Sequence, residues 1–120
     1  MEQDKLSKMK FEWIEMLRLE SVARGILAYR LEHEVLDGET RARLEEALEM
    51  TDYKVVRVMA GLTVLMADDC PLRRLFIEDG DARVIIIEEM VTTAQKRAQG
   101  QWAGALAAQA TRMAATAYKN

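Results

Sequence analysis

The side chains best suited to metal chemistry gather around the chain's one histidine, His33, which stands between Glu32 and Glu34. Imidazole and carboxylate groups are typical ligands of divalent metals. Consecutive residues on a helix point in different directions, however, and a helical carboxylate site needs Glu-x-x-His on one face, repeated on a second helix. Position 30 is arginine, and the chain has no second histidine. We therefore predict no metal site and interpret these three residues as a solvated charge cluster.

The candidate for nucleophilic catalysis is Cys70, the chain's one thiol. The carboxylates of Asp68 and Asp69 beside it disfavour a thiolate, whereas a helix that begins at Pro71 would favour one. The sole imidazole base, His33, is distant in sequence. We interpret Cys70 as a buried or loop cysteine. A lone cysteine also excludes an internal disulfide, which favours a reducing compartment.

Paired carboxylates and glycine-rich loops are two other common catalytic signatures. The neighbouring glutamates fall in segments with helical patterning, which places them on solvated helix surfaces; they are Glu45, Glu46, Glu49, Glu88 and Glu89. No Gly-x-Gly-x-x-Gly follows a strand, and no Gly-Lys-Ser/Thr sequence is present. We predict no catalytic residues and no cofactor, and we expect the protein not to be an enzyme.

Small residues recur along the C-terminal segment at a spacing that permits helices to pack closely. Gly100 and Gly104 form a small-x-x-x-small pair, and further small residues continue near the same stripe. A helix that is small or apolar on nearly all sides is usually central in a bundle or buried in an oligomer, and both interpretations stay open. The candidate partner-binding residues are Gly100, Trp102, Gly104, Ala107, Ala108 and Thr111.

Charge is distributed unevenly along the chain. After Glu89 there is no acidic residue, whereas cations continue to the C-terminus. Basic, amide and aromatic side chains follow one another around residues 95–102, a mixture that suits phosphate contact and base stacking. The same cations would also complement the dipole of a C-terminal helix and pair with the acidic N-terminal half.

A second group of cations flanks the loop around Pro71. Arg73 and Arg74 follow the proline, and Lys54 and Arg57 precede the loop. We hypothesise that folding brings these four cations together into one composite patch. The candidate nucleic-acid contacts of the whole chain are Lys96, Arg97, Arg112, Lys119, Arg73 and Arg74.

Long helices must position these residues, because the chain has one proline and six glycines in 120 residues. Apolar residues at 3–4 spacing predict a helix over about residues 4–36. Its two apolar stripes are slightly out of phase around residues 18–21, so this helix either bends there or is buried on more than one side. Asp37 is a candidate N-cap for the next helix.

Residues 39–67 carry a regular seam of the kind that packs against a neighbouring helix. The seam consists of Leu44, Leu48, Thr51, Val55, Val58, Leu62 and Leu65. Thr51 is its one polar member, and Thr51-Asp52 resembles an N-cap. We favour a break or bend at this point over one continuous helix.

The rest of the chain predicts a short helix after Pro71 and a long final helix. Residues 76–87 fit a β-hairpin or a helix, and the helical context favours a helix capped by Asp81. The final helix would run from residue 81 to 117, with a kink at residues 100–104 as the alternative.

Taken together, the pattern predicts an all-α fold: one domain over residues 1–120, a bundle of about four to five helices with a long N-terminal helix and a long Ala-rich C-terminal helix. The net charge of −3 gives no overall attraction to nucleic acid. No apolar run approaches the ~18 residues of a membrane span, and the charged N-terminus is unlike a signal peptide. We expect no membrane association and a cytoplasmic location, or the host cytoplasm for a viral protein.

The leading functional hypothesis is a non-enzymatic helical interaction protein, such as a subunit, adaptor or small regulator. It would act through protein contacts of its C-terminal helix, as a homo-oligomer or with a protein partner. One alternative is a small helical subunit of a viral or mobile-element nucleoprotein assembly that contacts nucleic acid through the basic C-terminal segment. Another is a bundle enzyme whose active site forms at an oligomer interface from glutamate, arginine and His33.

Overall fold

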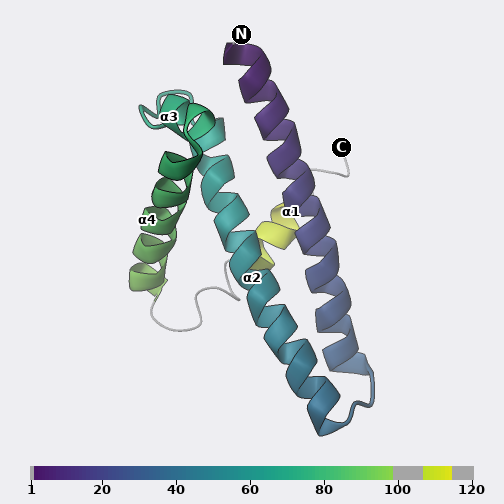
Figure 1. Cartoon of the computed structure of the whole chain (residues 1–120). Helices are drawn as coiled ribbons and strands as arrows, with labels where there is room; N and C mark the ends of the chain where they lie inside the picture. Colours follow the sequence, from purple (N-terminus) through teal and green to yellow (C-terminus); the bar gives the residue numbers. More distant parts are fainter. Residues whose placement is uncertain (1, 99–106, 115–120) are drawn as a thin grey trace.

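The structure is a computed structural model, and it describes residues 2–98 and 107–114. All regular structure in these residues is α-helical, which confirms the predicted fold class (Figure 1). The helices are α1 (Glu2–His33), α2 (Gly38–Met66), α3 (Arg73–Glu78) and α4 (Gly80–Ala98), and a further helical stretch covers residues 107–114. The long N-terminal helix is as expected.

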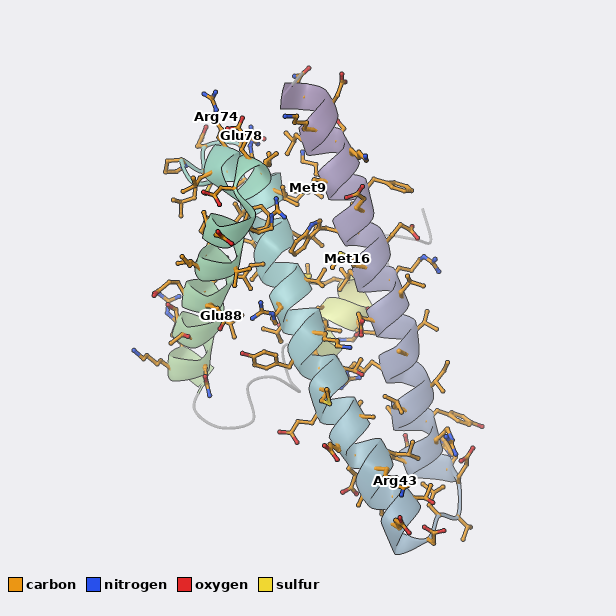
Figure 2. The ribbon with its side chains drawn as sticks, in the orientation of Figure 1. Met9, Met16, Arg43, Arg74, Glu78 and Glu88 are labelled. Atoms are coloured by element: carbon orange, nitrogen blue, oxygen red, sulfur yellow. The ribbon has the colours of Figure 1, made fainter. Side chains whose placement is uncertain are left out.

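Helix α2 is central to the architecture, because both α1 and α4 pack against it (Figure 1). Met9 and Met16 lie on the side of α1 that faces α2 (Figure 2). The core contains buried side chains from every helix, and Phe76, Leu65 and Val55 are its largest fully buried members. Trp13 of α1 completes it by packing edge-on against Phe76, with the ring centroids 5.4 Å apart.

The turn between α1 and α2 is fixed by the predicted cap. The Asp37 carboxylate accepts a hydrogen bond from the Thr40 backbone N–H at 2.7 Å. This satisfies one of the backbone donors that a helix start leaves without a partner. The backbone hydrogen bond from Thr40, joined by one from its side chain, lowers the pKa of Asp37 below its ordinary value.

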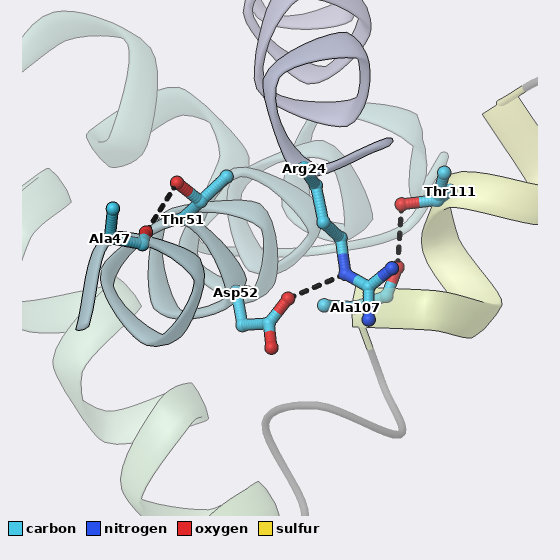
Figure 3. Close-up of polar contacts among 6 residues, drawn as sticks. All are labelled: Arg24, Ala47, Thr51, Asp52, Ala107 and Thr111. Atoms are coloured by element: carbon cyan, nitrogen blue, oxygen red, sulfur yellow. Dashed lines mark hydrogen bonds and ion pairs between the residues drawn. The ribbon is translucent and has the colours of Figure 1, made fainter. Parts of the chain in front are cut away.

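Helix α2 runs without interruption through Thr51 and Asp52, so the break that we favoured is wrong. The Thr51 hydroxyl donates to the Ala47 carbonyl at 2.8 Å (Figure 3). A threonine that satisfies its hydroxyl within its own helix does not need to act as a cap. The seam itself is confirmed over its second half, where Val55, Leu62 and Leu65 are buried.

Residues 76–87 are helical, so the hairpin alternative is wrong. Helix α3 ends at Glu78, and α4 begins at Gly80. The cap of α4 is Asp79 and not Asp81, because its carboxylate accepts the backbone N–H groups of Asp81 and Ala82 at 3.0 and 3.1 Å. The Asp-Gly turn signal therefore marks the junction between two helices.

The predicted single helix over residues 81–117 is not what the structure shows. Ala94 of α4 and Ala110 of the 107–114 helix line the same cavity of about 280 Å³. In one straight helix these two residues would lie about 24 Å apart, so the 107–114 helix packs back against α2 and α4. The proposed kink at residues 100–104 lies outside the described residues.

Candidate functional site

The residues with catalytic or ligating chemistry do not converge in the described part of the chain. His33 ends α1, where its ring lies 4.4 Å from that of Tyr29 and its Nε2 atom lies 3.9 Å from Glu32. Cys70 is half-buried in the loop after α2 and packs against the core. Within residues 2–98 and 107–114, no group of three or more His, Cys, Asp or Glu side chains is arranged to hold a metal ion.

The described residues of the predicted partner-binding face pack against the rest of this chain. Ala107 is fully buried, and Ala108 and Thr111 are half-buried. The Thr111 hydroxyl donates to the Ala107 carbonyl at 2.8 Å (Figure 3). Ala110 and Ala114, on the same side, belong to the core. Gly100, Trp102 and Gly104 lie outside the described residues.

The candidate nucleic-acid contacts are spread over the molecule. The Arg73 guanidinium donates to the Ala67 carbonyl at 3.1 Å, and Arg74 pairs with Glu78 at 3.5 Å. Ala67 follows Lys54 by about 20 Å along the direction of α2, so Arg73 and Arg74 do not form a composite patch with Lys54 and Arg57. They instead line a pocket of about 140 Å³ with Lys5 of α1.

The remaining basic candidates lie elsewhere. Lys96 and Arg97 are exposed in the last turn of α4, at the opposite end of that helix from α3. Arg112 is exposed on the 107–114 helix. Lys119 lies outside the described residues. The described candidate cations thus lie on three different parts of the fold: Arg73 and Arg74 on α3, Lys96 and Arg97 at the end of α4, and Arg112 on the 107–114 helix.

The surface feature that sequence reasoning missed is an apolar band on the outer side of α1. The band consists of side chains that are 52–67% exposed, namely Phe11, Leu19, Val22, Ile26 and Tyr29. At 100° per residue these positions fall within about 80° of the helix circumference and extend over about 27 Å. They lie opposite Leu6, Trp13 and Leu17, which face the core.

The signal for this band was present as the second, out-of-phase apolar stripe of the first helix. Leu19, Val22 and Ile26 belong to that stripe. The sequence predicts that this helix either bends or is buried on more than one side. In the structure, α1 is one continuous helix, and it buries only one side among the described residues.

The comparisons with other proteins give no relative: no family model, curated protein or solved structure matches this chain. In the described residues, no helix has both the length and the apolar character needed to cross a membrane.

Proposed function

We propose that this protein acts by binding protein, without chemistry of its own, and that it binds a second copy of itself through the outer face of α1. The observation that carries the proposal is the exposed band on this helix. Isolated apolar side chains on a surface are normal, whereas several on one face of a helix are typical of a contact surface. The face is apolar from Leu19 to Tyr29, and the Glu15–Arg18 ion pair separates this part from Phe11. The original hypothesis placed the contact on the C-terminal segment, but the burial of Ala107, Ala110 and Ala114 favours α1.

The size of the band fits a small reversible dimer. Side chains of this kind offer about 200 Å² each, so five of them at 52–67% exposure present on the order of 500 Å². Two copies paired through the band would bury about 1,000 Å², which is near the lower limit of specific interfaces. We therefore expect dissociation in the micromolar range.

The charges at the ends of α1 favour an antiparallel arrangement. Its N-terminal part carries three lysines, Lys5, Lys8 and Lys10, against Glu2 and Asp4. At its C-terminal end, Glu32 and Glu34 stand against Arg30, which pairs with Glu34. If two copies cross at residue 20, the centre of the band, Lys8 of one lies level with Glu32 of the other. The same register sets Phe11 level with Tyr29, so aromatic rings meet at both ends of the contact. Antiparallel helix dipoles add to the preference.

The test is the molar mass in solution, measured by light scattering over a concentration series from about 5 to 500 µM. Wild type is expected to shift from monomer to dimer, and the double variant Val22→Asp/Ile26→Asp to stay monomeric. The matched control, Val35→Asp/Met50→Asp, introduces the same charge at two exposed apolar side chains away from the band. A control that loses the dimer, or a band variant that keeps it, would overturn the proposal.

The nucleoprotein alternative finds no favouring observation in the described residues, because its candidate cations lie on different elements: α3, the end of α4 and the 107–114 helix. The enzyme alternative finds none either, because His33 lies at the exposed end of α1 among charges that face solvent. Both stay predictions of the sequence.

A further inference from the structure

The second unusual surface is a groove over α2, between α1 and α4. On α1 it is lined by Trp13, Met16 and Leu19, and on α4 by Val84 and Ile87. Its volume is about 410 Å³. Figure 2 shows Met16 of α1 and Glu88 of α4 on either side of α2. The 107–114 helix contacts other residues of α1 and α2, so it does not fill the groove.

Three cations surround this apolar groove: Lys54, Arg57 and Arg83, against one lining acid, Glu20. The excess is local, because the whole chain has a net charge of −3. An apolar floor with a basic edge is complementary to a ligand that is apolar on one side and acidic beside it.

Contacts within the fold hold the two arginines in place, and Arg57 is neutralised by Glu88, so the positive charge of the groove comes from Lys54 and Arg83. Arg83 donates to the carbonyls of Phe76 and Ile77 at 2.8 and 3.0 Å, and its Cζ lies 5.5 Å from the centre of the Phe76 ring. These partners are neutral, so the charge of Arg83 is not cancelled by them. Arg57 pairs with Glu88 and lies 6.0 Å from the centre of the Tyr53 ring. Fixed side chains lose little freedom when a ligand binds.

We propose that this groove binds an amphipathic helix of another protein, one that carries acidic residues beside its apolar face. The groove extends along α1 from Trp13 to Glu20, which is about 10 Å and matches two turns of a helix. Apolar side chains at positions i, i+3 or i+4, and i+7 would contact Met16, Val84 and Ile87. Acidic side chains beside them would approach Lys54 and Arg83. Val22 and Ile26 do not line the groove, but Leu19 belongs to both the groove and the band on α1, so the two proposed contacts share one side chain.

The probe is a fluorescein-labelled, 18-residue amphipathic peptide with leucine on one helical face and glutamate beside it. Its control has lysine in place of each glutamate. Fluorescence anisotropy with the full chain is expected to show binding of the acidic peptide at tens of micromolar, at least tenfold tighter than binding of the basic one. Affinity should fall as salt increases. Equal binding of both peptides would overturn the proposal.

Matched variants locate the binding site. Val84→Asp is expected to weaken binding at least tenfold. The control is Ile85→Asp, which changes the next residue; it is 62% exposed against 51% for Val84 and does not line the groove. Lys54→Glu is expected to weaken it several-fold, and Lys96→Glu, with the same change of net charge in the exposed last turn of α4, not to. If Val84→Asp binds like wild type, the groove is not the site. If the peptide fails to bind and Val84→Asp abolishes the dimer, a second copy fills the groove and the proposal is wrong.

Discussion

Arg24 and Asp52 form an ion pair that joins α1 to α2 across 28 residues of chain, with Nε and Oδ1 2.5 Å apart (Figure 3). Their side chains are only 19% and 10% exposed. Removing two charges from water costs free energy, and the pair recovers this cost only while both partners are present. The pair therefore favours the register of α1 and α2 that brings these two side chains together.

Loss of one partner of this pair is expected to be strongly destabilising. Arg24→Met leaves the Asp52 carboxylate buried without its cation and should lower the free energy of unfolding by about 3 kcal/mol. The double variant Arg24→Met/Asp52→Leu should recover much of that loss. The comparison is Arg43→Met, because Arg43 and its partner Glu39 are both 76% exposed and such pairs contribute less than about 1 kcal/mol. Urea denaturation gives all three values, and equal losses for Arg24→Met and Arg43→Met would contradict the prediction.

The contact between Trp13 and Gly61 predicts opposite effects of alanine at two helical glycines. A Cβ added at Gly61 would overlap the Trp13 ring, whereas one added at Gly25 meets nothing within 4 Å. Gly61→Ala should therefore force the indole out of place, destabilise the fold by about 1–3 kcal/mol and change the tryptophan fluorescence. Gly25→Ala should stabilise the fold by up to about 1 kcal/mol through helix propensity. Thermal unfolding followed by circular dichroism measures both, and a neutral Gly61→Ala would show that the packing is loose.

The cap at Asp37 predicts a pH dependence of stability. Hydrogen bonds from Thr40 lower the pKa of this carboxyl in the folded state. Its contribution is therefore present above the unfolded pKa and is lost as the pH falls through the folded pKa. Asp37→Ala should lower Tm at pH 7, and the difference from wild type should narrow below about pH 4.

Asp37→Asn is the control for this prediction, because its amide oxygen still accepts the hydrogen bond but does not titrate. It should retain most of the cap at pH 7 and show no narrowing from this position. A Tm difference between wild type and Asp37→Ala that is the same at pH 3 and pH 7 would contradict the assigned role.

The helices could be predicted from the sequence because their apolar spacing is regular. The Val55–Leu65 part of the seam is buried as the 3–4 pattern requires. Thr51 was misleading, because the residue type of an N-cap is also compatible with a hydroxyl that bonds four residues back in its own helix. Residue type alone does not decide whether a threonine caps a new helix or bonds within its own helix.

Contacts between distant segments could not be predicted. For Arg24, the sequence offers Glu20 as an i,i+4 partner, but the structure selects Asp52, because crossing of α1 over α2 brings that carboxylate closer. The packing of Ala110 against α2 likewise depends on which surface of the first helices is left open. The apolar band on α1 was visible as a second stripe, but its exposure became clear only when the core-facing side was known.

The most direct test of self-association through α1 is a distance between two copies, measured by electron–electron resonance on spin-labelled protein. Ser7→Cys and Gly25→Cys, each in a Cys70→Ser background, place a label on the same side of α1, near its start and near the centre of the band. Antiparallel pairing centred on residue 20 predicts about 40 Å between the labels at position 7 and about 20 Å at position 25. Equal short distances at both positions would mean parallel pairing, and no distance at either position at 500 µM would contradict the proposed dimer.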